Sequence, residues 1–372
     1  MIKKIKLFFK AQPVLVIAFI AAVITMFIVP PDGEYAGYCN RTVLIQLFSL
    51  MLAVAGLRST GIFERLTDII LKKAGNIRKL CLMFIIICFF SSMLVTNDVA
   101  LITFVPLTIL TFEHIKDEKS RIVTIVLETA AANLGSMLTP VGNPQNLYLY
   151  DTYRLTAYEF VRTMLPAGVL GIILLILFTF ILPKTSCRTH EGSISEINIK
   201  NTAVYAILFA VCLMTVFRFI PDYICLIAAV MVGLVCDRKL LVKVDYALLF
   251  TFVCFFVFVG NIARIEAVST FFSGVLSGRE VLVSALLSQI ISNVPAAVML
   301  SGFTGEGTRL LLGVNIGGLG TIIASLASLI SYQFYRKSEN AQSGRYMLMF
   351  SAINFSMFAI MLVFGIVMQK TV

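Results

Sequence analysis

The stretch that decides the fold runs from Glu128 to Leu149 and reads ETAAANLGSMLTPVGNPQNLYL. It starts as an apolar helix, stops in the run Thr139-Pro140-Val141-Gly142-Asn143-Pro144-Gln145-Asn146, and then becomes apolar again. The two prolines and the glycine remove backbone donors and allow conformations that no continuous helix accepts. At membrane depth, such unpaired backbone is tolerated only where it is buried in protein or lines a polar cavity. The stretch therefore predicts a broken membrane helix at a binding site, as in secondary transporters.

The composition indicates an all-α polytopic membrane protein, because 59% of the 372 residues are hydrophobic and only 13% are charged. The eight cysteines are scattered through mostly apolar runs, which fits small buried side chains better than disulfides or a metal site. The only histidines, His114 and His190, lie in charged connecting segments and form no cluster for a transition metal. The net charge of +10 lies in loops, so we interpret it as a topology signal and expect no nucleic-acid partner.

The apolar runs predict about nine spans plus two hairpins. The spans cover 11–29, 42–57, the broken helix 122–150, 164–182, 203–219, 223–236, 247–261, the broken helix 309–335, and 346–368. Segment 58–79 has the spacing of an amphipathic surface helix. The pairs 80–112 and 281–303 have arms shorter than the ~20 residues of a span, which predicts re-entrant hairpins. Two tight spans with an exposed turn are the alternative.

The second half of the chain repeats the first, element by element. Asn97 at one hairpin tip corresponds to Asn293 at the other, and Asn133 in one broken helix corresponds to Asn315 in the other. The expected units are a first inverted repeat at 1–182, a linker and connecting span at 183–222, and a second inverted repeat at 223–372. The odd connecting span would invert the second half. Most of the 30 basic residues fall in loops on one side, which predicts a cytoplasmic N-terminus and an outside C-terminus in the inner membrane.

Both hairpin tips and both breaks are expected to converge near the midplane. Half-helix N-termini there suit an anion, and unwound carbonyls suit sodium. The candidate substrate-binding residues are Asn97, Thr139, Pro140, Gly142, Asn143, Asn146, Ser292, Asn293, Pro295, Gly320, Thr321 and Ser325. The candidate ion- or proton-coupling residues are Thr96, Asn97, Asp98, Glu128, Asn133, Asn293 and Asn315. We expect no cofactor other than a possible coupling sodium at the Asn97 and Asn293 tips; the alternative is that these residues merely cap short helices.

Asp98 and Glu128 are ionisable groups in otherwise apolar segments. A charge there costs ~2.5–3.5 kcal/mol on insertion scales, so a functional or paired role is the default. Either could be the proton-coupling group. The alternatives are that Asp98 is a helix N-cap and that Glu128 pairs with a loop cation near the membrane surface.

Several catalytic motifs are missing from the sequence. The glycine-rich run Gly313 to Gly320 lacks the Lys and Ser or Thr of a phosphate loop, and neither HExxH nor GxSxG occurs. The sequence therefore predicts neither an ATP-driven pump nor an intramembrane enzyme.

At the hairpin tips and the helix breaks, the chain resembles the ion transporter superfamily, which contains citrate and dicarboxylate carriers, arsenite permeases and a family of sodium/proton antiporters. The motifs that carry this resemblance most specifically are Glu128-x4-Asn133-x-Gly135 with the Thr139 to Asn146 run, the two tips, and Gly320-Thr321-x3-Ser325. The tips resemble the arsenite and antiporter branches. Asn143 stands where the antiporter branch usually has Asp, which favours an anionic or neutral solute over plain cation/proton exchange. The resemblance implies an elevator mechanism and a homodimer formed through the scaffold.

We therefore expect a secondary active transporter of a small anion, a carboxylate above all, coupled to sodium or protons. The alternative within the class is an arsenite permease or a sodium/proton antiporter. A passive channel is a remote alternative, because it would need a continuous polar path and the sequence instead has paired breaks.

Overall fold

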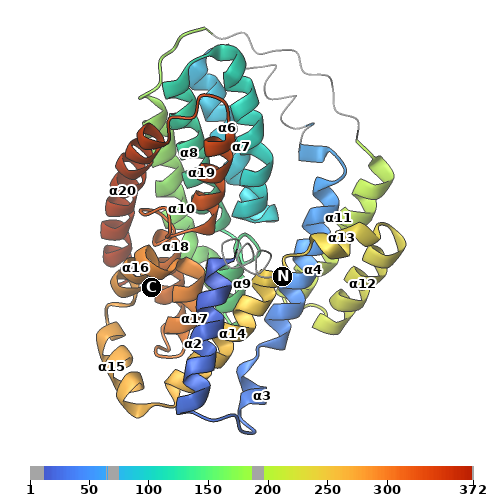
Figure 1. The fold of residues 1–372 in the computed structure, drawn as a ribbon, viewed down its shortest axis with the longest axis vertical. Coiled ribbons are helices and arrows are strands. Elements are labelled where there is room, and N and C mark those ends of the chain that lie inside the picture. Colours follow the sequence, from blue (N-terminus) through green and yellow to red (C-terminus); the bar gives the residue numbers. More distant parts are fainter. Residues whose placement is uncertain (1–11, 64, 66–74, 187–196, 371–372) are drawn as a thin grey trace, which may run out of the picture.

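The computed structural model describes residues 12–63, 65, 75–186 and 197–370 (Figure 1), and over these residues the chain is helical apart from one isolated bridge between Asn76 and Ser186. The helices are α2 (Pro13–Ile28), α3 (Tyr35–Tyr38), α4 (Arg41–Arg58), α6 (Ile77–Val95), α7 (Asn97–Ile115), α8 (Glu118–Ser136), α9 (Pro144–Thr152), α10 (Ala157–Thr179), α11 (Ile199–Val216), α12 (Asp222–Val235), α13 (Arg238–Lys243), α14 (Tyr246–Ala263), α15 (Glu266–Leu276), α16 (Glu280–Ile291), α17 (Asn293–Ser301), α18 (Gly307–Ile316), α19 (Leu326–Lys337) and α20 (Ser343–Met368).

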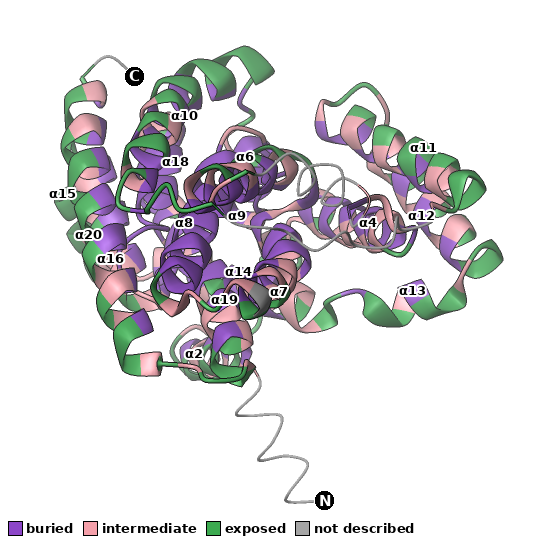
Figure 2. Cartoon of the chain, turned by 90° about the horizontal axis from the view of Figure 1, so that it is seen from above, coloured by how far each residue is buried: buried purple, intermediate pink, exposed green. Residues whose placement is uncertain are grey.

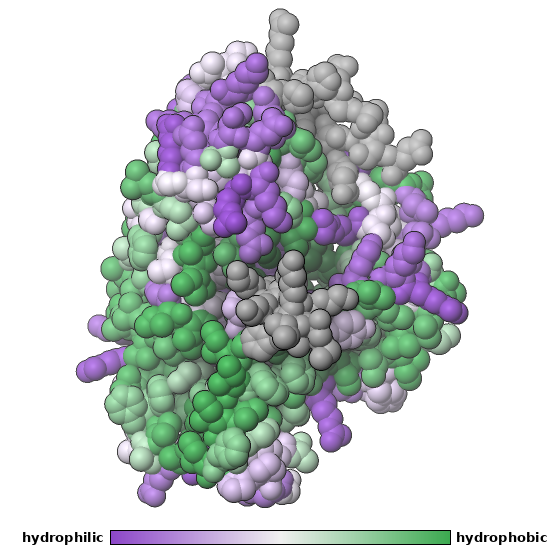
Figure 3. Space-filling view, in the orientation of Figure 1, coloured by the Kyte–Doolittle hydropathy of each residue, from purple (hydrophilic) through white to green (hydrophobic). Residues whose placement is uncertain are grey.

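Six of these helices are long and apolar enough to cross a membrane, namely α4, α6, α10, α11, α14 and α20. Helices α2 and α12 are apolar but shorter. Large hydrophobic side chains are exposed along α2, α10, α12 and α20, and Figure 3 shows a broad hydrophobic surface below a hydrophilic upper end. Exposed apolar surface on this scale is stable only in lipid, so the prediction of a multi-pass membrane protein is confirmed.

The first hairpin differs in length from the prediction. Helices α6 and α7 contain 19 residues each, so the expectation that both arms are too short to span is wrong. Helix α6 begins earlier because Asn76 caps it by accepting a hydrogen bond from the backbone N–H of Lys79. The two helices do form a hairpin, since Ile77 and Phe84 near the start of α6 pack against Phe112 near the end of α7. Residues 64 and 66–74 of the surface helix expected at 58–79 lie outside the described residues.

The turns of the two hairpins have the same backbone conformation. Thr96 joins α6 to α7 with φ 73° and ψ 150°, and Ser292 joins α16 to α17 with φ 75° and ψ 154°. Residues other than glycine rarely occupy this region, which costs of order 1–3 kcal/mol and is concentrated at functional sites. The same strained turn, followed by asparagine, therefore occurs once in each half.

The two broken helices also match. Helix α8 is followed by a break over 137–143 and then α9, and α18 is followed by a break over 317–325 and then α19. Asn143 and Ser325, the N-caps of α9 and α19, are both extended. The prediction that the break continues to Asn146 is wrong, because Pro144 starts α9 at a first-turn position where its missing N–H costs nothing.

The helices fall into two groups. Seen from above in Figure 2, α4, α11, α12 and α13 lie together beside a larger group that contains both hairpins and both broken helices. Helix α14 packs on α2 and also contacts α4 and α17, so it joins the two groups.

Candidate functional site

Each hairpin tip is hydrogen-bonded to the break in its own half. The backbone N–H of Asn97 donates to the carbonyl oxygen of Gly142 at 3.2 Å, and that of Asn293 donates to the carbonyl oxygen of Ala324 at 2.9 Å. In both halves the acceptor is the residue before the N-cap of the second half-helix. The tips and breaks are therefore fixed to each other by the same contact twice.

A threonine in each break makes a second matching contact. Thr139 Oγ1 donates to the carbonyl oxygen of Met93 at 2.5 Å, and Thr321 Oγ1 donates to the carbonyl oxygen of Gln289 at 2.9 Å. The side chain of Gln289 also accepts from the backbone N–H of Thr321 and donates to the carbonyl oxygen of Gly317. Gln289 was not among the predicted site residues, because a single glutamine in an apolar helix was the one signal that the sequence offered for it.

Asn133 joins the two halves of the chain. Its Oδ1 accepts from Asn97 Nδ2 at 3.0 Å and from Ser325 Oγ at 2.9 Å. Its Nδ2 donates to the carbonyl oxygen of Gly318 at 3.3 Å. The side chain is 4% exposed, so these bonds form without competition from bulk water. The predicted convergence of the first tip, at Asn97, with the second break, at Ser325, is thus observed, and Asn133 is the residue that joins them.

A second pair of asparagines crosses between the halves close by. Asn315 Nδ2 donates to Asn146 Oδ1 at 2.7 Å. Asn146 in turn donates to the carbonyl oxygens of Ser136 and Thr139, which holds the first break closed on itself. Asn146 therefore supports the break from the first turn of α9, and it does not belong to the unwound segment.

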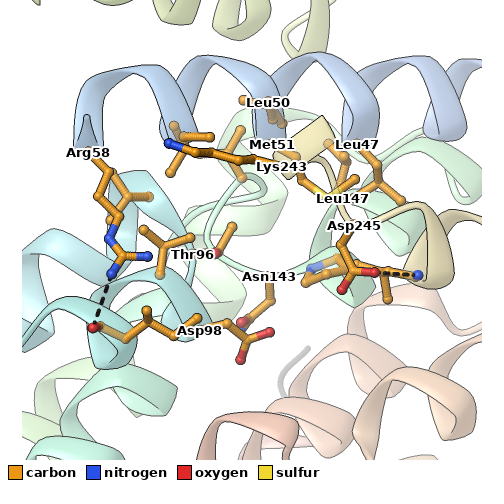
Figure 4. A pocket seen from close by; sticks show the side chains of 18 of the residues that line it. Leu47, Leu50, Met51, Arg58, Thr96, Asp98, Asn143, Leu147, Lys243 and Asp245 are labelled. Atoms are coloured by element: carbon orange, nitrogen blue, oxygen red, sulfur yellow. Dashed lines mark hydrogen bonds between the residues drawn. The ribbon is translucent and has the colours of Figure 1, made fainter. Parts of the chain in front are cut away.

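A cavity of about 750 Å³ lies between helix α4 and the tip and break of the first half. Thr96, Asp98 and Asn143 line it on one side, and Arg58 of α4 lines it on the other. Figure 4 shows these side chains around the same space, with Lys243 and Asp245 at the junction of α13 and α14. The volume suits a small solute.

Two buried oxygens at this cavity have no hydrogen-bond partner in the part of the chain that the structure describes. They are Oδ1 of Asp98 and Oδ1 of Asn143. The amide of Asn143 donates to Ser136 Oγ at 2.7 Å, which directs its free oxygen away from that bond. The alternative that Asp98 is an N-cap is wrong, because Thr96 occupies that position and Asp98 lies in the first turn of α7. Such oxygens can accept from a hydroxylated solute or bind a small cation.

The cavity carries charges of both signs. Arg58 donates through Nη2 to the carbonyl oxygen of Ile102 at 3.3 Å, so its guanidinium is held against α7. Lys243 ends α13, and Asp245 caps α14 by accepting from the backbone N–H of Leu248. None of these three charged residues was among the candidates, because each lies in a loop or at a helix end with no motif around it.

From the second half, Lys243, Asp245 and Leu248 line this cavity. The predicted site residues of that half do not line it: Ser292 and Asn293 lie at the second tip, and Gly320, Thr321 and Ser325 lie in the second break. Pro295 is buried in the first turn of α17. Among the first-half candidates, the residues that do not line the cavity are Asn97, Thr139, Pro140, Gly142 and Asn146. Only part of the predicted site thus faces the cavity. The other predicted polar residues form hydrogen bonds that hold the tips and breaks in place.

Glu128 lies apart from the cavity, fully buried in α8. Its Oε1 accepts from Thr108 Oγ1 at 2.7 Å, and its Oε2 has no partner. The alternative that Glu128 pairs with a loop cation near the surface is therefore wrong for the described residues. Within the same described ranges, no group of three or more His, Cys, Asp or Glu side chains could hold a metal ion.

Comparison with known proteins identifies the family. The model of a citrate transporter family matches residues 5–305. The chain is 35% identical to an uncharacterized transporter of Methanocaldococcus jannaschii, over 82% of this chain and 83% of that protein. It is 30% identical to the inner membrane protein YbiR of Escherichia coli, over 77% and 78%.

Two further matches are more distant. A silicon efflux transporter of Oryza sativa is 27% identical over 40% of this chain and 30% of its own. The crystal structure of the Alcanivorax borkumensis YdaH transporter is similar in fold, with a TM-score of 0.58, 14% identity, and coverage of 91% of this chain and 87% of that one. The chain belongs to the citrate transporter family and is a transporter, not an enzyme.

Proposed function

We propose that the chain is a secondary active transporter that moves a small anion, a carboxylate above all, and that a sodium or proton gradient drives this transport. The observation that carries this proposal is the cavity beside the first tip and break, which combines Arg58 and Lys243 with backbone and amide groups. Arg58 and Lys243 would neutralise the anion, and its hydroxyl groups would donate to Asp98 and Asn143. The name of the family supports the carboxylate.

The proposed mechanism is an elevator. The moving unit would contain both hairpins and both broken helices, and the scaffold would contain α2, α4, and α11 to α14. The position of the cavity between α4 and the first tip supports this division. In this proposal 1–182 and 223–372 are inverted repeats joined by 183–222, the N-terminus is cytoplasmic, the C-terminus is outside, and the scaffold forms a homodimer.

In the sodium-coupled version of this proposal, the ion would bind at the first tip. Oxygen atoms are the ligands that sodium takes from broken helices, and the free oxygens of Asp98 and Asn143 fit that role. The side-chain oxygen of Asn97 already accepts from the backbone N–H of Asp98 at 2.9 Å. Asn97 would therefore position the site, and Thr96 would fix its turn.

A neutral hydroxylated solute such as arsenite is the second candidate. Two buried acceptors without donors favour it, since each hydroxyl of such a solute can supply one hydrogen bond. The silicon efflux relative supports the same class. Plain sodium/proton exchange is less well supported, because Asn143 cannot carry a charge.

The test is the thermal stability of the purified protein with citrate, succinate, malate, arsenite or sulfate, each in sodium and in choline. A bound solute stabilises the folded state by RT ln(1 + [L]/Kd). A carboxylate shift that requires sodium would support the proposal, and a shift with arsenite alone would favour the second candidate. Asn97→Ala and Asn293→Ala should each abolish transport while the protein stays folded; normal uptake by both variants would refute the site.

A further inference from the structure

We infer that Glu128 is a proton-binding group separate from the solute cavity and that it carries the coupling proton of transport. The inference rests on the proposed function, because it names which ion drives transport and where that ion binds. It starts from a carboxyl group that the solute site does not use.

The surroundings of Glu128 leave its carboxyl group without charge compensation. Among the described residues, Thr108 on α7 supplies its one hydrogen bond, to Oε1. The titratable groups that face it are Cys81 and Cys88 of α6 and Tyr346 of α20. Among the described residues of α7, α10, α18 and α19, no charged group faces it.

Nearby cations are already engaged. Arg121, two turns earlier on α8, pairs with Glu118 and donates to the carbonyl oxygen of Glu339. An isolated carboxylate inside the membrane costs ~2.5–3.5 kcal/mol on insertion scales, and neutralisation removes that cost. Because Oε1 is occupied as an acceptor, the acid proton belongs on Oε2, the atom that has no partner.

Two stacked tyrosines lie near Glu128 and Glu118 of α8. The hydroxyl of Tyr346 is buried near Glu128 and Thr129. The ring of Tyr346 stacks on that of Tyr335 with centroids 4.7 Å apart. The hydroxyl of Tyr335 donates to Glu118, which is partly exposed. Ring stacking is not a hydrogen bond, so these tyrosines are polar neighbours of the proton site and not a continuous proton path.

The proton step is simple in its balance. The O–H bond at Oε2 breaks, the electron pair stays on the carboxylate of Glu128, and the proton leaves to water. The carboxylate takes up a proton from water when the site faces the opposite side of the membrane.

Glu128 is not needed to build the broken helix. Asn133 matches Asn315 in the second half, and by the same offset Glu128 matches Leu310, which is also fully buried. Leucine therefore meets the packing demand at this position of the helix. A carboxyl group in only one half points to a task beyond packing.

Infrared difference spectroscopy of the full-length protein in lipid nanodiscs tests the proton site directly. We expect a protonated-carboxyl band that declines as the pH rises, and Glu128→Gln should remove it. Glu280 provides a matched control, because it is also buried but faces Arg309 and Gln369. Glu280→Gln should leave the band in place.

Thr108→Val is a second variant that tests the proton site even if Glu128→Gln fails to fold. It should shift the frequency of the band without removing it, because the acid loses one donor and keeps its proton. A band that survives in Glu128→Gln, or one that does not respond to pH, would overturn the inference. Neither result would bear on which solute the protein transports.

Proteoliposomes separate coupling from solute transport. With labelled citrate, we compare exchange at equal pH on both sides with accumulation under a pH gradient. Glu128→Gln should lower the ratio of accumulation to exchange by ~10-fold or more, a factor that corresponds to ~1.4 kcal/mol. An unchanged ratio would overturn the inference while the proposed function stands. If the wild-type protein moves no citrate at all, the proposed carboxylate fails, and the infrared result alone decides the proton site.

Discussion

Replacing Asn133 by alanine should destabilise the protein more than any other single truncation in the polar network. The change removes three hydrogen bonds, to Asn97, Ser325 and Gly318, at a position that is 4% exposed. Each partner left buried without a bond costs ~1–3 kcal/mol. Because water can bond to some of the groups that lose their partner, we expect a loss of ~3–6 kcal/mol in the free energy of unfolding.

The assay is unfolding of the purified protein by titration with a denaturing detergent, followed by circular dichroism. Asn354→Ala is the matched control, since Asn354 is equally buried but donates only to the carbonyl oxygen of Phe350 in its own helix. That control should change the unfolding free energy by less than ~1.5 kcal/mol. Equal losses in the two variants would refute the role of Asn133 as the link between the halves.

Three further predictions concern turns, packing and charge. Thr96→Gly should stabilise the protein by about 1 kcal/mol by relieving the turn at φ 73°, measured by the same titration; destabilisation would refute the strain. Gly135→Ala should destabilise it by ~1–3 kcal/mol, because a Cβ there would lie 2.0 Å from a carbonyl oxygen of α6, whereas Gly274→Ala, with nothing within 4 Å, should not. The Arg264 guanidinium, 2.8 Å from Asp32, holds the pKa of that carboxyl below its usual 3.8, so this pair stabilises the fold above that pH and the contribution is lost as pH falls. Asp32→Asn should therefore flatten the acidic limb of the stability curve, and an unchanged limb would contradict the pairing.

The breaks and tips could be predicted because their signals are local. Proline and glycine at Pro140 and Gly142 interrupt a helix whatever surrounds them, and an asparagine after a short apolar run marks a helix start. The matching order of such signals in both halves made the convergence of the tip at Asn97 and the break at Ser325 predictable. Tertiary packing then brought them within hydrogen-bonding distance.

The charged side of the cavity could not be predicted in the same way. Arg58 ends α4, and Lys243 and Asp245 lie around the start of α14, far from the first tip in sequence. Only the packing of α14 on α4, and of α4 on α9, places them at one cavity. The length of α6 was missed for a different reason, because the capped turn that begins at Ile77 is charged and does not look like part of a span.

The two halves share backbone contacts but not chemistry. Where the first half has Asp98, Asn143 and Glu128, the matching positions of the second half hold Val294, Ser325 and Leu310. The tip and break contacts survive these differences, since they use backbone atoms and threonine hydroxyls.

This asymmetry has a consequence for substitution experiments. Changes at Thr139 and Thr321, whose hydroxyls hold the break to the hairpin in each half, should damage folding and transport together. Changes at the three polar positions found only in the first half should alter solute choice or coupling while the fold persists. Carboxylates placed at Val294 and Leu310 in a variant of the second half would then add charge without adding function, because neither position lines the cavity.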